Sequence, residues 1–113
     1  MASVSRVVLL DSALTATRTG DPVSLELYSY AFKGYIAATA VNGATTINAK
    51  IQHSADKLNW FDLITFAAIA GVASAEAKDP TVNVLPYVRA VATLTGGVQA
   101  ATVTVALYFD KVK

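Results

Sequence analysis

Cysteine is absent from the 113-residue chain, histidine occurs once and charged residues are scarce. Without cysteine there are no disulfide frameworks and no thiolate zinc sites, and a single histidine removes most Cys/His catalytic arrangements. Charged residues make up 15% of the chain, against roughly 25% in an ordinary soluble domain. Because the formal net charge is only +1, we expect no nucleic-acid partner.

Long apolar runs are also missing. The longest, Phe66–Ala73, contains Gly71 and falls short of the roughly 20 residues of a membrane-spanning helix. Near the start only Val7–Leu10 is apolar, and no small-residue cleavage site follows it. We therefore expect no membrane association and a protein made in the cytoplasm.

Apolar residues are abundant, at 54% of the chain. With so few charges, the surface has to carry many alanines, valines and aromatics. An apolar surface usually marks a contact with another protein. The alternative is that exposed alanine is simply inert.

The residues alternate in polarity with a period of two, which is typical of half-buried strands. In Thr46–His53, Ile47, Ala49 and Ile51 point one way and polar residues the other. Seven or eight such segments, with no amphipathic helix, predict one domain over residues 1–113. Its fold class is all-β, an antiparallel β-sandwich, jelly-roll-like or Ig-like.

Two hairpins are predicted. Asn42-Gly43 suits a type I′ turn between Tyr35–Val41 and Thr46–His53, and Gly96-Gly97 separates Tyr87–Thr95 from Val98–Phe109. The other expected strands are Val4–Leu10, Val23–Phe32, Trp60–Ile69 (covered on both faces) and a short edge strand or loop at Val72–Lys78. The predicted core contains Trp60, Leu63, Val88, Leu94, Val103, Val105 and Leu107.

No constellation of residues predicts catalysis. Neighbouring residues on a strand point to opposite faces, so His53 and Ser54 do not form a dyad by spacing. The acids are dispersed, and Asp56 with Asp62 indicates turn chemistry rather than a calcium site. No glycine-rich phosphate loop occurs. We expect no enzyme activity, no cofactor and no metal.

The aromatic residues are the more informative set. Tyr28, Tyr30 and Phe32 share one face of a predicted strand, Tyr35 follows closely, and Trp60 opens another strand. Such a row suits contact with a protein, stacking on sugar rings, or packing in the core.

Two segments carry a family resemblance: Ile51–Leu63 (IQHSADKLNWFDL) and Leu85–Ala90 (LPYVRA). Their pattern resembles small β-sandwich proteins of tailed-bacteriophage virions. In it, a strand ends in His-Ser, a short turn contains Asp, a Trp opens the next strand, and a further strand begins Pro-Tyr-Val-Arg. The family most similar is the capsid decoration, or cement, protein. The resemblance covers the central and C-terminal two thirds of the chain; discoidin-like sugar and lipid binders share its Ser-x-Asp turn followed by Trp.

This resemblance implies a structural virion protein on the surface of an icosahedral phage capsid, assembled in the host cytoplasm. Its partner would be the major capsid protein, and it would self-associate as a homotrimer or homodimer to bridge capsomers. Residues 1–6 are the candidate N-terminal arm, or else an ordinary edge strand, and they lack the Pro and Gly of a family arm. The candidate interface residues are Val4, Arg6, Tyr28, Tyr30, Phe32 and Tyr35. A neck or tail protein and a carbohydrate-binding module are the alternatives.

Overall fold

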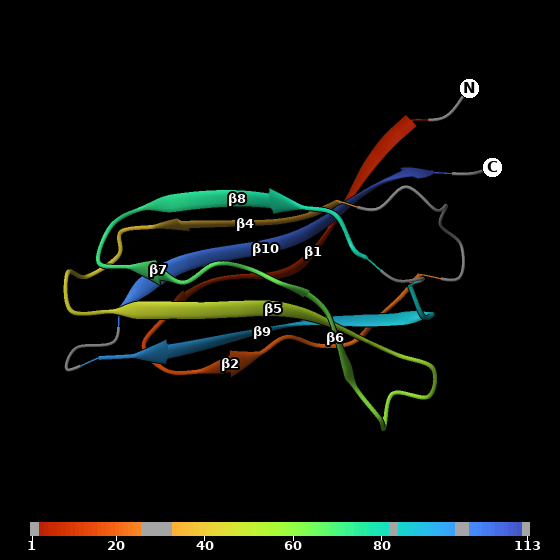
Figure 1. Ribbon diagram of the computed structural model, residues 1–113, viewed down its shortest axis with the longest axis horizontal. Helices are drawn as coiled ribbons and strands as arrows, with labels where there is room; N and C mark the ends of the chain where they lie inside the picture. Colours follow the sequence, from red (N-terminus) through yellow and green to blue (C-terminus); the bar gives the residue numbers. More distant parts are fainter. Residues whose placement is uncertain (1–2, 26–32, 82–83, 97–99, 112–113) are drawn as a thin grey trace.

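The computed structural model describes residues 3–25, 33–81, 84–96 and 100–111, and within the first and last strands it describes the side chains of residues 8–14 and 101–108. Within these ranges, ten strands form two antiparallel sheets that stack as two layers (Figure 1). The predicted all-β sandwich is confirmed. The strand number exceeds seven or eight because the edges of one sheet are divided into short pieces.

The four-stranded sheet has the order β1-β10-β4-β8. Its strands are β1 (Ser3–Leu14), β10 (Ala101–Lys111), β4 (Lys33–Thr39) and β8 (Ser74–Lys78). The six-stranded sheet has the order β2-β9-β5-β6, with β3 also paired to β9 and β7 to β5. Its strands are β2 (Arg18–Thr19), β9 (Tyr87–Thr95), β5 (Thr46–Ser54), β6 (Phe61–Thr65), β3 (Val23–Ser24) and β7 (Ile69–Ala70).

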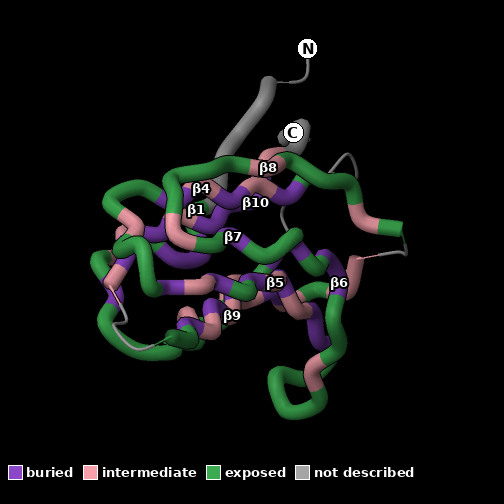
Figure 2. Tube along the Cα trace, turned by 60° about the vertical axis from the view of Figure 1, so that its left-hand side comes forward, coloured by how far each residue is buried: buried purple, intermediate pink, exposed green. Residues whose placement is uncertain are grey.

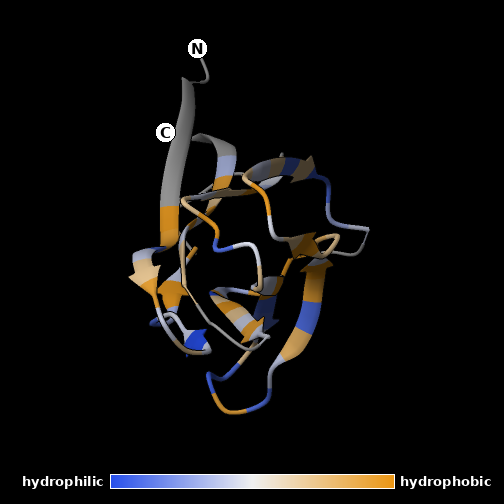
Figure 3. Ribbon diagram, turned by 90° about the vertical axis from the view of Figure 1, so that its left-hand side faces the viewer, coloured by the Kyte–Doolittle hydropathy of each residue, from blue (hydrophilic) through white to orange (hydrophobic). Residues whose placement is uncertain are grey.

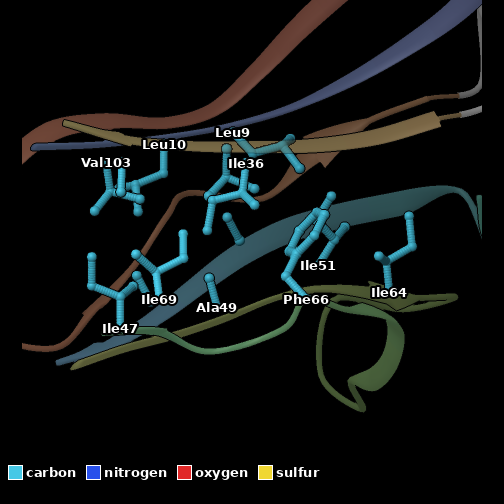
Figure 4. Packing of buried hydrophobic residues seen from close by; sticks show 14 of the residues in the cluster. Leu9, Leu10, Ile36, Ile47, Ala49, Ile51, Ile64, Phe66, Ile69 and Val103 are labelled. Atoms are coloured by element: carbon cyan, nitrogen blue, oxygen red, sulfur yellow. The ribbon is translucent and has the colours of Figure 1, made fainter. Parts of the chain in front are cut away.

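The core lies between the two sheets (Figure 4). Leu9, Leu10 and Ile36 of the four-stranded sheet pack against Ile47 and Ile51 of the six-stranded sheet. Alternate residues of β5 and β9 are buried, as the period of two predicts. Six of the seven predicted core residues belong to this cluster: Leu63, Val88, Leu94, Val103, Val105 and Leu107. The seventh, Trp60, is half-buried, so its assignment to the core is wrong.

Both predicted hairpins are wrong. β4 pairs with β10 and β8, whereas β5 pairs with β9 and β6, so Asn42-Gly43 carries the chain from one sheet to the other. Neither residue has a positive φ, which a type I′ turn requires at both positions. Likewise, β9 ends before Gly96 in one sheet and β10 begins at Ala101 in the other. The two connections are arches between layers.

The arches meet at one end of the sandwich. Asn42 N donates to Ala100 O at 3.0 Å, and Gly71 N donates to Thr45 O at 2.9 Å. Ala100 N donates to the hydroxyl of the buried Thr45 at 3.1 Å. A Cβ on Gly96 would collide with the carbonyl oxygen of Ala44 in the neighbouring arch. We call Asn42, Thr45, Gly71, Gly96 and Ala100 the arch end; it lies at the left of Figure 1.

The predicted single strand Trp60–Ile69 is divided into β6 and β7. A bulge between Ile51 and Gln52 shifts the pairing of β5 with β6, so Leu63 and Ile64 are both buried. After Thr65 the chain leaves the sheet, and Phe66 N donates to Ala49 O at 3.1 Å.

This irregular segment is held by β8, which the sequence predicted as an edge strand or loop. Glu76 Oε1 accepts a hydrogen bond from Ala67 N at 2.8 Å, and Lys78 Nζ donates to Thr65 O at 2.9 Å. The two side chains of β8 therefore bind the backbone of the opposite layer.

The N-terminal strand lies at the edge of the four-stranded sheet. Residues 3–6 of β1 pair with residues 108–111 of β10. Val4 is opposite Asp110 and Arg6 is opposite Tyr108. Of the strand predicted at Val23–Phe32, residues 23–25 are described, and β3 covers the first two of them.

Candidate functional site

The outer face of the four-stranded sheet is built mainly from small and apolar side chains. Ile36 and Val105 belong to the core, so their neighbours along β4 and β10 point outward. We call the outward set the alanine–tyrosine face. Among the described side chains it contains Val8, Asp11, Ala13, Lys33, Tyr35, Ala37, Thr39, Ala75, Ala77, Thr102, Thr104, Ala106 and Tyr108.

Two aromatic rings stand over an alanine on this face. Tyr35 is opposite Ala106, and the rings of Tyr35 and Tyr108 meet edge to face with centroids 5.9 Å apart and planes at 89°. Ala106 has 0% exposure although it points away from the core cluster. The rings and neighbouring strands therefore bury an alanine on the outside of the sandwich.

Charge on the alanine–tyrosine face is sparse. Asp11 Oδ1 accepts a hydrogen bond from the Thr104 hydroxyl at 3.0 Å. At the border, Lys33 Nζ lies 2.9 Å from Asp79 Oδ1. Among the described side chains, Asp11, Lys33 and Asp79 therefore all have partners. One row across the four strands consists of Val8, Ala106, Tyr35 and Ala77.

The outer face of the six-stranded sheet has the opposite character. Lys50 Nζ and Gln52 Nε2 each lie 3.1 Å from Asp62 Oδ1, and Arg89 Nε donates to Gln52 Oε1 at 2.9 Å. The Arg89 guanidinium lies over the Trp60 ring, 4.2 Å from its centroid. We call these five residues the polar ladder. Hydrogen bonding from Gln52, then from Lys50, lowers the pKa of Asp62.

The polar ladder explains why Trp60 was misassigned. The sequence predicts a core tryptophan because a large apolar residue opens a strand. In the structure one face of the ring is covered by Arg89, and Trp60 Nε1 donates to Lys57 O at 3.2 Å. Because a cation covers that face, it is not a free platform for a sugar ring.

His53 has a structural arrangement rather than the geometry of a catalytic base. It is buried, and its Nδ1 accepts a hydrogen bond from Leu85 N at 3.0 Å. Desolvation lowers its pKa. The Ser54 hydroxyl donates to Asp56 Oδ1 at 3.0 Å and accepts from backbone amides. The two residues therefore contact different partners.

Among the described residues, no three His, Asp or Glu side chains gather closely enough to hold a metal ion. In the same ranges, no helix of the length and apolar character needed to span a membrane is found.

Among the candidate interface residues, Tyr35 lies on the alanine–tyrosine face and is half-buried. Val4 and Arg6 lie on β1, where the backbone is described. Tyr28, Tyr30 and Phe32 lie outside the described residues. The alanines of this face were not predicted as interface residues. Their signal was present in the alternation of Ser74–Lys78, where Ala75 and Ala77 share one parity.

No known family model and no curated protein matches this chain. Solved structures do match. The SPBc2 prophage-derived protein YomS has a TM-score of 0.59 at 11% identity, with 98% of this chain and 96% of that chain covered. A chain of infectious bursal disease virus Gx strain has a TM-score of 0.60 at 10% identity. A chain of the Gt strain has a TM-score of 0.57, also at 10% identity.

The coverage differs between these matches. The alignments span 96% of this chain but only 33% of each infectious bursal disease virus chain. The YomS alignment spans nearly the whole of both chains. What these proteins share at such low identity is the fold.

Proposed function

We propose that this chain is a structural virion protein. It binds the outer surface of an icosahedral phage capsid, contacts the major capsid protein and stabilises the shell by bridging capsomers. It acts by binding and not by catalysis. The observation that carries the proposal is the alanine–tyrosine face, an apolar outer face on a molecule whose other outer face has a hydrogen-bonded polar ladder.

Two further observations support this proposal. The structural neighbours carry viral and prophage names, and the segments at Ile51–Leu63 and Leu85–Ala90 resemble cement proteins. A sheet face with small side chains also permits close approach of another protein surface, because packing of flat faces is limited by side-chain size.

The physical role follows from the size of the face. Specific stable interfaces bury about 800 Å² per partner. A sheet four strands wide, with about 4.8 Å between strands, offers less over the 7 residues of β4. Each contact should therefore be weak by itself. Self-association as a homodimer or homotrimer would multiply the contacts, because linked sites bind with a raised effective concentration.

The test is rebinding to shells of the parent phage that lack this protein. Wild-type chain should co-sediment with the shells and raise their melting temperature. Ala75→Arg places a long cation on the exposed part of the alanine–tyrosine face and should reduce the bound fraction at least tenfold. The matched control is Asn48→Arg on the outer face of the six-stranded sheet, which should bind like wild type. Equal binding by both variants would contradict the role of this face.

Position in the particle is tested separately. Gold-labelled chain imaged by electron microscopy should decorate the whole shell. Labels confined to one vertex or to the tail would instead support the neck or tail alternative. Mass measurement over a concentration series tests self-association, and a strictly monomeric species at the highest concentration would remove the dimer and trimer.

A further inference from the structure

The loop between β5 and β6 presents an apolar side chain to solvent. Leu58 is 82% exposed, the highest value among the exposed large apolar residues of the described chain. The loop projects away from the two layers (Figure 2). In Figure 3 its tip is hydrophobic and is flanked by hydrophilic segments. Phe61, the first residue of β6, is also exposed.

The backbone of this loop is fixed by its own side chains. Asp56 Oδ1 accepts from Leu58 N and Asn59 N, each at 2.9 Å, and Asp56 Oδ2 accepts from Asn59 Nδ2 at 2.9 Å. Ser54 Oγ accepts from Asp56 N at 3.2 Å and Lys57 N at 2.9 Å. The Asn59 amide, followed by the Leu58 amide, holds the pKa of the Asp56 carboxyl far below its usual range.

Lys57 carries a local strain within this arrangement. Its φ is 64°, in the left-handed region that residues other than Gly and Asn rarely adopt. Strain of this kind persists only where the surroundings enforce it. The loop therefore presents Leu58 in a conformation formed in advance, which lowers the entropy cost of binding.

Lys57 in the loop and Arg89 beside it each lie over an aromatic ring. Lys57 Nζ lies 5.1 Å from the centroid of Tyr87, and Arg89 Cζ lies 4.2 Å from that of Trp60. Arg89 uses Nε to bind Gln52, and no other hydrogen bond from its guanidinium is found among the described residues. Tryptophan, tyrosine and arginine are the residues most enriched at the energetic centres of protein interfaces.

We propose that the loop Ser54–Trp60 is an insertion element: Leu58 enters an apolar depression on the major capsid protein, and carboxylates at the rim of that depression pair with Lys57 and Arg89. This inference rests on the proposed function for the identity of the partner. It adds a second contact, distinct from the alanine–tyrosine face, with its own chemistry.

Among the described side chains, the charges favour a partner that supplies carboxylates of its own. The chain has eight acidic residues; the side chains of six are described, and five of these six already bind a partner. Those five are Asp11, Asp56, Asp62, Glu76 and Asp79. Within the described residues Asp21 alone is left to pair with two cations. A capsid surface that supplies two or more carboxylates fits the loop better.

The experiment measures binding kinetics of the whole chain on immobilised shells. Leu58→Ser should dissociate at least tenfold faster than wild type, because its apolar contact is lost. The matched control is Val72→Ser, which removes another apolar side chain, 66% exposed, from the link between β7 and β8. Val72→Ser should bind within twofold of wild type. Both variants should keep the wild-type melting temperature, since neither side chain is buried.

The electrostatic half is tested with Lys57→Asn, since asparagine tolerates a positive φ. This variant should associate more slowly than wild type and show a flatter dependence of the association rate on salt. Leu58→Ser binding as tightly as wild type, or Lys57→Asn keeping the full salt dependence, would overturn the inference.

The same data separate this inference from the proposed function. If wild type binds shells and Ala75→Arg does not, yet Leu58→Ser binds normally, only the insertion element is wrong. If wild type does not bind shells, both are wrong.

Discussion

The two ends of the sandwich use similar local chemistry for different purposes. At the arch end, Asn42 Oδ1 accepts from Ala44 N at 2.9 Å; in the β5–β6 loop, Asp56 does the same for Leu58. The arch end, however, joins segments far apart in the chain, because Thr45 receives bonds from Ala100 and Gly71. In the loop, the bonds close within seven residues. The bonds of the arch end therefore connect the two sheets, whereas the bonds of the loop fix only the loop's own conformation at the surface.

The largest effect that this comparison predicts is at Gly96. Its φ is 119° and an added Cβ would collide with the Ala44 carbonyl oxygen. Gly96→Ala should lower the free energy of unfolding by about 3 kcal/mol or more. Gly43→Ala is the control at the same end, because its Cβ would meet nothing within 4 Å. Similar denaturation midpoints for the two variants would show that the two arches are not in tight steric contact at Gly96.

The next effect is at Thr45. Thr45→Val keeps the shape but leaves Ala100 N without the hydroxyl acceptor, which should cost about 1 to 3 kcal/mol. Thr46→Val, at a half-buried neighbour, should cost less. Urea unfolding of both variants measures the difference in stability. Equal midpoints would show that the Thr45 hydroxyl does not stabilise the arch end.

A smaller effect involves pH and His53, which lies where β5 enters the loop. Burial lowers its folded-state pKa below the ordinary 6.5, so the unfolded chain binds the proton more readily. Stability from this residue is complete above about pH 6.5 and is lost as the pH falls toward the folded-state pKa. Protonation also removes the Nδ1 lone pair that accepts from Leu85 N.

The measurement is the melting temperature between pH 7.5 and pH 5. It should fall with decreasing pH in wild type and change less in His53→Gln. Parallel curves for the two proteins would be inconsistent with a neutral buried imidazole.

The smallest effect on global stability is expected in the loop. Asp56→Ala removes the acceptor for Leu58 N and Asn59 N. Amide hydrogen exchange at these two residues should accelerate while the melting temperature hardly changes, because the bonds serve the loop alone. Asp21→Ala is the control. A large fall in melting temperature for Asp56→Ala would mean that the two ends differ less than we argue.

Alternation along the strands was enough to predict the fold class and six of the seven core residues. The connections were not predictable in the same way. The dipeptide Asn42-Gly43 between two alternating segments fits both a hairpin and a connection between opposite layers. The contacts that fix the connection in this structure come from Ala100 and Gly71, which are distant in sequence. The assignment of Trp60 to the core was wrong for a related reason, because Arg89, the cation that covers its ring, is distant in sequence.

The candidate surface was only partly predictable. The low content of charged residues indicated that part of the surface would be apolar, but it did not indicate which strands would carry that part. Tyr35 belongs to the alanine–tyrosine face through its register with Ala106, and the partners of Ala75 and Ala77 follow from β4 pairing with β8. Leu58 was passed over because a leucine in a turn carries no pattern of its own.

The pairing of β1 with β10 cannot form until residues 101–111 have been synthesised. β1 is complete at Leu14, but its hydrogen-bonding partner begins at Ala101. At synthesis rates of about 5–20 residues per second, the first strand waits roughly 5 to 20 seconds with its leucines unprotected. Until β10 is made, the unpaired edge of β1 is open to pairing with other chains.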